Sequence, residues 1–241
     1  MGESQTAAGR TTFDVSPSRD CPICPRLAAF RAANRAAFPD WSNAPVNSFG
    51  DGDARLLIVG LAPGLRGANR TGRPFTGDYA GDLLYETLLR FGFASGVYDR
   101  RPDDGLRLVD CAIVNAVRCV PPENKPTPAE IRACRAFLIQ SFAALPRLQA
   151  VLALGRIAHE TVLRALGVRL ALFPFAHGAR HAPPGGPAVF DSYHCSRYNT
   201  NTGVLTADMF RAVFADIRAA LDGEGGRGPA REGAFQSGGD E

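Results

Sequence analysis

This 241-residue chain contains almost no lysine, and it also lacks long apolar runs and a strong charge of either sign. The 27 basic residues nearly balance the 24 acidic ones, so the net charge of +3 permits a nucleic-acid partner without indicating one. Lys125 is the only lysine, which leaves almost no group for Schiff-base chemistry. No stretch of about 18 apolar residues could span a membrane, and Met1 is followed by a polar segment instead of an apolar signal core. We therefore expect a soluble, cytoplasmic protein.

Length and composition predict a single domain between two flexible tails. A hydrophobic content of 45% is sufficient for one well-buried core. Residues 1–19 are polar and aperiodic, and residues 222–241 are rich in glycine, so neither end can repay its ordering entropy. We expect the folded domain to span residues 20–221.

The pattern of apolar residues predicts the α/β fold class. Short runs rich in Leu, Ile and Val alternate with longer segments of helical period, which indicates a parallel sheet with helices on its faces. The four predicted strands cover residues 55–61, 111–117, 150–154 and 188–193. The predicted helices cover residues 82–91, 128–145, 156–166 and 207–221.

Ligands of such sheets bind beyond the carboxyl ends of the strands. The loops at residues 62–81, 118–127 and 194–206 are therefore the places to look for a site.

Four of the six cysteines are spaced as metal ligands. Cys21 and Cys24 form a C-x2-C turn in a polar segment that offers little core to fill, whereas Cys119 follows a predicted strand and Cys134 lies within a predicted helix. In a reducing compartment such cysteines are better metal ligands than disulfide partners. Their number suits either tetrahedral zinc or an iron–sulfur cluster. Cys111, in the middle of a strand, is expected to fill the core.

The loop after the first strand, GLAPGLRG followed by NRTGRPFTGD, is rich in glycine. Glycines allow backbone amides to approach a ligand closely. The loop matches the known phosphate-binding motifs poorly, because it lacks both the Lys-Ser/Thr ending and a complete G-x-G-x-x-G. The arginines Arg66, Arg70 and Arg73 together with Phe75 instead suggest contacts to a nucleic-acid backbone and a base.

Three segments taken together resemble the signature blocks of the family 5 (type B) uracil-DNA glycosylases. They are GLAPG with NRTGRPFTGD, then NAVRCVPPENKPTPAE, then HCSRYNTNTGVLT, and with the preceding CPIC turn the similarity spans residues 21–221. The resemblance implies a three-layer α/β/α sandwich around a four-stranded parallel sheet. It also implies hydrolysis of the N-glycosidic bond of uracil in DNA and a [4Fe-4S] cluster. The ligands implied for this cluster are Cys21, Cys24, Cys119 and Cys134.

The resemblance also implies roles for three side chains. Phe75 matches the aromatic residue that stacks on the extruded base. Asn115 matches the base-reading asparagine, whose amide can both donate to and accept from a pyrimidine edge. His194 matches the catalytic histidine, which would donate to the uracil O2 as negative charge develops on the leaving base.

The first block offers two candidates for the residue that positions the attacking water. Ala62 stands where many uracil glycosylases carry an acidic or amide group, so we expect Asn69 or Asp78 to orient the water. Gly60 and Asn199 complete the expected substrate-binding set. The small side chain of Ala62 also predicts a roomy pocket that admits hypoxanthine or other deaminated bases.

The expected protein is a monomeric, monofunctional glycosylase that acts on damaged DNA at a bacterial-type nucleoid. Lys125 is the only lysine in these blocks, and it does not stand where a Schiff-base lyase would need one, which argues against a lyase step. A non-catalytic four-cysteine module that binds nucleic acid is the alternative, although it would not explain Asn115 and His194 at strand ends. A nucleotide hydrolase would need a magnesium site and a loop ending that the sequence lacks.

Overall fold

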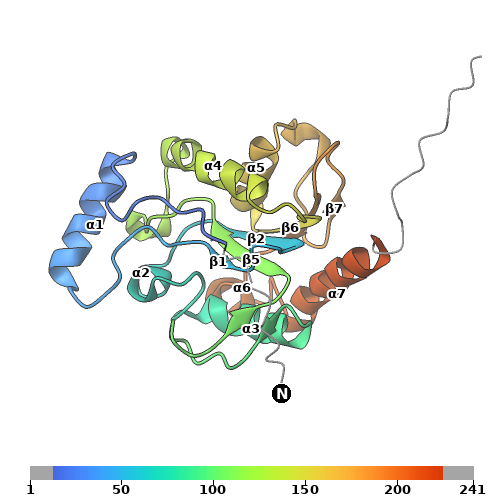
Figure 1. Ribbon diagram of the computed structural model, residues 1–241, viewed down its shortest axis with the longest axis horizontal. Helices are drawn as coiled ribbons and strands as arrows, with labels where there is room; N and C mark the ends of the chain where they lie inside the picture. The colour runs from blue at the N-terminus through green and yellow to red at the C-terminus, as the bar shows by residue number, and fades with distance from the viewer. Residues whose placement is uncertain (1–12, 225–241) are drawn as a thin grey trace, which may run out of the picture.

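The computed structural model describes residues 13–224, which form a sheet with helices on both faces (Figure 1). The strand order is β1-β5-β2-β6-β8-β7, and the four central strands run parallel. These strands are almost entirely buried, as expected for continuous Leu, Ile and Val runs covered on both faces. The four predicted strands are confirmed as β2 (Leu56–Gly60), β5 (Cys111–Asn115), β6 (Ala150–Leu154) and β8 (Ala188–Ser192).

The sheet has six strands, so the expectation of four was wrong at its two edges. β1 (Phe49–Gly50) pairs antiparallel with β5, and β7 (Arg180–His181) pairs antiparallel with β8. Each edge strand contains two residues, which is too short to show a period in the sequence. A separate two-stranded sheet joins β3 (Ala94–Ser95) to β4 (Arg107–Leu108).

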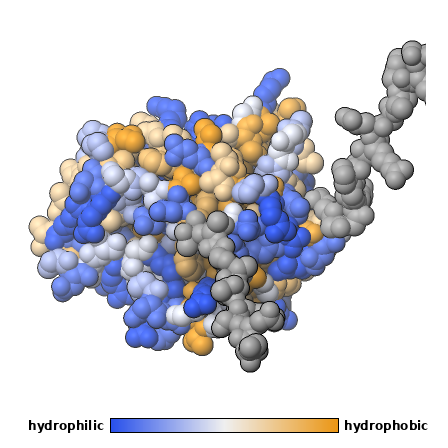
Figure 2. Space-filling model, in the orientation of Figure 1, coloured by the Kyte–Doolittle hydropathy of each residue, from blue (hydrophilic) through white to orange (hydrophobic). Residues whose placement is uncertain are grey.

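Helices cover the two faces of the sheet and produce the expected three layers (Figure 1). Alternate residues of each strand point to opposite faces, so that Leu56 and Ile58 join one core cluster while Leu57 and Val59 join the other. The first cluster packs under α3 (Tyr79–Arg90) and α7 (Ala207–Glu224), and the second under α4 (Pro128–Ala143) and α5 (Arg156–Ala165). All four predicted helices are therefore present. On the face seen in Figure 2, hydrophilic residues are interspersed with smaller hydrophobic patches.

Sequence signals explain where these helices begin and end. Thr127 caps α4 and accepts from the Glu130 amide, while the Glu130 side chain accepts from the Thr127 amide. After α5, Gly167 has a φ of +73°, a left-handed conformation that glycine adopts without strain.

The N-terminal part of the chain contains structure that the sequence did not predict. α1 (Pro25–Ala37) follows directly from the CPIC turn, with Cys24 at its N-cap position. Residues 13–19, expected to belong to a tail, pack against the domain, and Phe13 is buried in the core under α4 and α5. The other parts of the expected tails, residues 1–12 and 225–241, lie outside the described residues.

Four short helical elements complete the described chain: α2 (Ala68–Thr71), η1 (Pro122–Asn124), η2 (Leu170–Leu172) and α6 (Arg197–Asn201). Within residues 13–224 no helix combines the length and apolar character needed to cross a membrane.

Candidate active site and cysteine site

A cavity of about 900 Å³ opens at the carboxyl end of the parallel strands. Its walls come from the loop after β2, from Asn115 at the end of β5, and from His194 beyond β8. Asn124, from the loop that follows β5, also lines it. The three loops expected to hold a site therefore meet in one place.

Gly60, at the end of β2, allows Phe75 and Asn115 to approach each other. A Cβ atom on Gly60 would lie 2.5 Å from the Asn115 Oδ1 and 2.6 Å from the Phe75 Cζ, closer than any side chain could tolerate. Phe75 itself has a φ of +52°, an uncommon backbone conformation for a bulky residue. Gly60 therefore contributes to the site by having no side chain, and both Phe75 and Asn115 line the cavity as expected.

His194 faces the same cavity as Phe75, and the centroids of their rings are 6.1 Å apart. Burial lowers the pKa of His194, so the ring is neutral near pH 7 and can donate a hydrogen bond from one nitrogen. Asn199 does not line the cavity, because its side-chain amide donates to the backbone carbonyl of His194 at 2.8 Å. Asn199 thus positions the histidine, and the structure does not bring it to the expected substrate-binding place.

Asp78 is the carboxylate of the cavity. Burial raises its pKa, and the amides of Ala80 and Gly81 at the start of α3 offset part of that effect. Its Oδ1 is buried and has no hydrogen-bond partner among the described residues. A Cβ atom on Gly67 would lie 2.2 Å from the other oxygen, so the glycine makes room for the carboxylate.

Asn69, the other candidate for positioning water, lies elsewhere. Its side chain is 1% exposed, donates to the Asn43 Oδ1 at 2.9 Å and does not line the cavity. Of the two candidates, the structure places only Asp78 at the site. Ala62 does line the cavity, with only a methyl group directed from that position.

Arg73 is not available to bind a nucleic-acid backbone, contrary to expectation. It is 5% exposed and forms a two-pronged ion pair with Asp104, at 2.8 Å and 2.7 Å. Arg66 and Arg70 are exposed, and Arg66 lines the cavity.

The rim of the cavity includes residues to which sequence reasoning gave no role. Arg197 lies over the ring of Tyr79, 5.3 Å from its centroid, and both residues line the cavity. Next to them, Tyr198 on α6 is 74% exposed. Arg197 and Tyr198 lie within the third block, HCSRYNTNTGVLT, and this position was the available signal.

The four predicted ligand cysteines line one small cavity at the N-terminus of α1. None of them forms a disulfide with another described cysteine, and burial raises the pKa of the Cys134 thiol to about 11. Within residues 13–224, no three of these sulfur atoms lie within 4.8 Å of one another. Cys111 is buried in β5 as expected, and the buried Cys195 thiol contacts the Ala80 carbonyl at 3.4 Å.

Two arginines beside this cavity were not singled out by the sequence analysis. Arg31, on α1, lines it, and Arg118 directly precedes Cys119 in the chain. Burial lowers the pKa of Arg118 to about 10, which still leaves the group charged at neutral pH. The position of Arg118 next to a candidate ligand was the available signal.

A second group of potential ligands is already engaged in hydrogen bonds. Asp191 contacts the His159 Nδ1 at 2.7 Å and the His181 Nε2 at 2.9 Å. The second ring nitrogen of His159 lies 2.9 Å from the Phe173 carbonyl oxygen. These hydrogen bonds connect α5, β7 and β8 and stabilise their packing.

The fold and the site together define an α/β/α protein whose cavity suits a flat, hydrogen-bonding base: it offers an aromatic ring, an amide and a neutral imidazole at the carboxyl edge of a parallel sheet. The family follows from comparison with known proteins. Residues 47–218 match the uracil DNA glycosylase superfamily, and the chain belongs to this superfamily.

Individual relatives agree with this assignment. A type-5 uracil-DNA glycosylase from Thermus thermophilus is 47% identical over 204 residues, which cover 82% of this chain and 92% of the relative. One from Pyrobaculum aerophilum is 39% identical and covers 84% of this chain and 89% of its own length. A type-4 uracil-DNA glycosylase from the same organism is 38% identical over 50% of this chain and 55% of its own. The resemblance to the type-5 branch is thereby confirmed.

Proposed function

We propose that this chain removes uracil from DNA by hydrolysing the N-glycosidic bond, leaving an abasic site. The observation that carries the proposal is the meeting of Phe75, Asn115 and His194 in one cavity. The names of the relatives that align over most of the chain support the same activity.

The reaction begins with a base that has left the duplex, because a glycosidic bond inside a stack is out of reach. The ring of Phe75 offers a face on which the base stacks. The amide of Asn115 reads the pyrimidine edge by donating one hydrogen bond and accepting another. These contacts hold the base between the ends of β2 and β5.

Departure of the base places negative charge on the uracil ring. A neutral His194 donates a hydrogen bond to O2 and stabilises that charge most in the transition state. Asn199 contributes by holding the His194 carbonyl, and thereby the position of the ring.

Water completes the hydrolysis by attacking the sugar. Asp78 orients this water through its free Oδ1, since the other candidate, Asn69, is bonded to Asn43. A sugar cation needs only a weak nucleophile when the leaving group is well stabilised. No lysine is required, in keeping with a monofunctional enzyme.

The substrate range follows from the size of the cavity. Ala62 contributes only a methyl group to its wall, which leaves space for a purine such as hypoxanthine. Other deaminated bases that present a similar edge to Asn115 fit the same argument. The proposal also retains the expected monomer acting on nucleoid DNA in the cytoplasm.

The cofactor proposed for the cysteine site is a [4Fe-4S] cluster held by Cys21, Cys24, Cys119 and Cys134. The donor set fits such a group, because four thiols line one cavity and this number suits either an iron–sulfur cluster or zinc. The resemblance of the signature blocks favours the cluster. It would supply a rigid tie between the CPIC turn and the β5–α4 region, and it takes no part in the chemical steps above.

The experiment for the activity is product analysis with matched oligonucleotides that contain uracil, hypoxanthine or thymine at one position. We expect an abasic site from uracil and, more slowly, from hypoxanthine. Binding to the uracil oligonucleotide without cleavage would favour the non-catalytic four-cysteine module.

The cofactor has its own test. Iron and acid-labile sulfide analysis should find four of each per chain, because a [4Fe-4S] cluster contains four of each by definition. We expect Cys21→Ser or Cys134→Ser to lose iron and to lower the melting temperature, because each removes one of four ligands. Cys111→Ser, at a buried cysteine outside the site, is the control for iron content. Full iron content in both ligand variants would contradict the assignment.

A further inference from the structure

Two buried arginines lie next to the candidate ligands, and within residues 13–224 neither forms an ion pair with a carboxylate. Arg31 lines the cysteine cavity, whereas Arg118 precedes Cys119 and donates its backbone amide to the Cys134 Sγ. Arg118 is 1% exposed and Arg31 is 5% exposed. Removing an unpaired guanidinium from water is costly, so buried arginines are almost always balanced by an anion. An anion that balances the positive charges of Arg118 and Arg31 is therefore expected at this site.

The guanidinium of Arg118 contacts only neutral oxygen atoms. Its Nη1 donates to the Ser48 Oγ and its Nη2 to the Ser141 Oγ, each at 3.1 Å, while Nε has no partner. The two hydroxyls give their own protons to the carbonyls of Val15 and Phe137, at 2.8 Å and 2.7 Å. Both hydroxyls are thus fixed as acceptors, but neither carries a charge that could balance the arginine.

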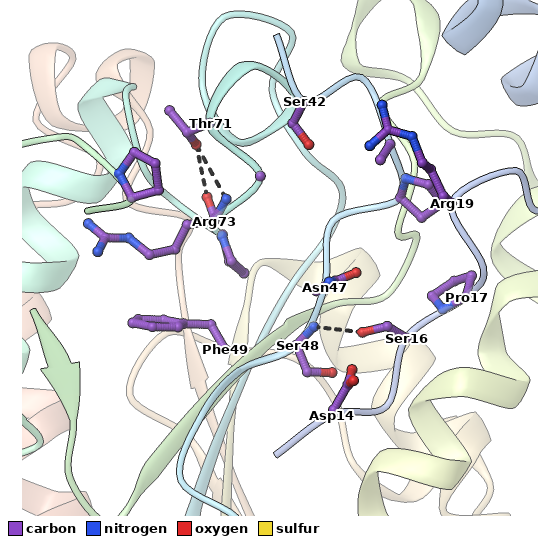
Figure 3. A pocket seen from close by; sticks show the side chains of 15 residues that line it. Asp14, Ser16, Pro17, Arg19, Ser42, Asn47, Ser48, Phe49, Thr71 and Arg73 are labelled. Atoms are coloured by element: carbon purple, nitrogen blue, oxygen red, sulfur yellow. Dashed lines mark hydrogen bonds between the residues drawn. The ribbon is translucent and has the colours of Figure 1, made fainter. Parts of the chain in front are cut away.

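The position of this guanidinium is firmly set by its surroundings. The Ser48 amide donates to the Ser16 Oγ at 3.2 Å, so the N-terminal segment holds one of its acceptors in place (Figure 3). Ser141 is fixed on α4. Asp14, whose charge reaches Arg118, is exposed to solvent and forms no ion pair with it. The Arg118 guanidinium is therefore held in place and cannot reorient to pair with a carboxylate.

Arg31 approaches the cysteines from α1. Its Nη1 donates to the Cys119 Sγ at 3.5 Å and its Nη2 to the Cys21 carbonyl at 2.9 Å. Glu130 is the buried carboxylate nearby, but Arg26 already takes both of its oxygens, at 2.8 Å and 2.7 Å. Asp20, whose charge also reaches Arg31, is exposed and forms its ion pair with Arg35, so no described carboxylate pairs with Arg31.

We propose that Arg118 and Arg31 are the counter-charges of the cysteine-bound cluster, acting as positioning residues that retain it and make it easier to reduce. The inference rests on the proposed [4Fe-4S] cluster. Four thiolates give such a centre negative charge, and this is the anion that the two buried cations otherwise lack.

Physical chemistry gives the direction of the effect on the cluster. Each electron added increases the negative charge of the cluster, so nearby cations favour the reduced form. Hydrogen bonds to sulfur act in the same direction, and the Arg118 amide donates to the Cys134 Sγ at 3.4 Å. The same charges favour retention of the metal, because they offset repulsion among the thiolates.

The test compares Arg118→Gln, Arg31→Gln and the charge-preserving Arg118→Lys with wild type. Arg55→Gln is the control: Arg55 is a partly buried arginine bonded to Asp110 at 2.8 Å and does not line the cysteine cavity. One readout is the midpoint potential, from a dithionite titration followed by electron paramagnetic resonance. The other is the rate of iron loss to a chelator.

We expect both Gln variants to shift the midpoint potential to more negative values and to lose iron on the order of 10- to 100-fold faster, the usual effect of losing a partner of a metal ligand. Arg118→Lys should stay closer to wild type, and Arg55→Gln should match it. If Arg118→Gln does not fold, Arg31→Gln and Arg118→Lys decide the matter, because Arg31 lies on a separate helix.

Two negative results can be told apart. Wild-type protein without iron and sulfide would overturn the cluster proposal, and this inference with it. Wild-type protein with an intact cluster, together with Gln variants of unchanged potential and iron retention, would overturn the counter-charge role alone.

Discussion

At the scale of single residues, the proposed mechanism separates groups that hold the base from a group that stabilises charge. In that mechanism Phe75 and Asn115 contact the base throughout the reaction, whereas the hydrogen bond from His194 gains strength as the base leaves. Variants of these residues should therefore affect different quantities.

His194→Ala should lower the rate of the chemical step by about 10²- to 10³-fold, the usual effect of removing one preorganised donor. DNA affinity should change little, because it depends mostly on contacts to phosphates. Single-turnover cleavage and a separate binding assay measure the two effects. A loss of binding in proportion to the loss of rate would contradict the role assigned to His194.

Asp78→Asn should slow cleavage while making the protein more stable at neutral pH. Because burial raises the pKa of Asp78, the folded state favours the neutral acid, and the ionised form lowers stability once the pH exceeds that raised pKa. An amide of the same size avoids this cost.

Thermal melting at pH 7 measures the stability of Asp78→Asn, and wild type should approach the variant as the pH falls through the raised pKa of the carboxyl toward the usual value for an aspartate. The rate of wild type should also fall on acidification over the same range, above the usual range for an aspartate. A variant that melts lower than wild type at pH 7 would show that the carboxylate stabilises the fold.

At the scale of elements, the sequence predicted the parts of the fold that repeat. Strands such as β2 and β5 are continuous apolar runs because both of their faces are covered, and α4 begins at a capping box that can be read directly. The edge strands could not be predicted, because two residues show no period, and β1 in addition pairs with a strand that is distant in the chain. α1 was missed since three of its residues, Leu27, Arg31 and Asn34, are buried and two of these are polar.

The candidate site shows the same division. Phe75, Asn115, His194 and Cys119 lie in recognisable blocks, and the other three candidate ligands were singled out by their spacing. Asn69 and Arg73 lie in the same blocks, but their partners Asn43 and Asp104 are distant in the chain and turn both side chains away from the cavity. Such pairings depend on tertiary structure, which a linear pattern does not carry.

Asp191→Ala tests the tie between α5, β7 and β8. Removal of the carboxylate leaves buried nitrogens of His159 and His181 without partners, at a cost of roughly 1–3 kcal/mol for each group. Urea denaturation should show the lower stability. The control is Asp208→Ala, which removes an exposed ion pair with Arg211 and should change stability by less than about 1 kcal/mol. Equal stability of the two variants would show that the hydrogen bonds of Asp191 with His159 and His181 do not stabilise the fold.

At the scale of the whole molecule, binding of DNA does not depend on a large net charge. A value of +3 provides little long-range attraction, so affinity should depend on a few arginines near the cavity. Arg66 lines the cavity and Arg70 is exposed on the short α2.

Arg66→Ala and Arg70→Ala should each weaken DNA binding at low salt. Each should also reduce the slope of log affinity against log salt by about 0.9, the value for one lost phosphate contact. Arg90→Ala is the matched control, because Arg90 lies at the end of α3 opposite to the cavity. Unchanged salt slopes in both loop variants would show that these arginines do not contact phosphates.

The cysteine site also has a consequence for how the protein is made. Its first two cysteines precede every strand of the sheet in the chain, whereas Cys134 follows β5 on α4. The ion pair of Arg26 with Glu130 beside it joins residues 104 positions apart. During synthesis, the four thiols can therefore meet only after more than half of the polypeptide has left the ribosome. The proposed cluster could therefore assemble only from that point of synthesis onward, which would couple the supply of iron to translation.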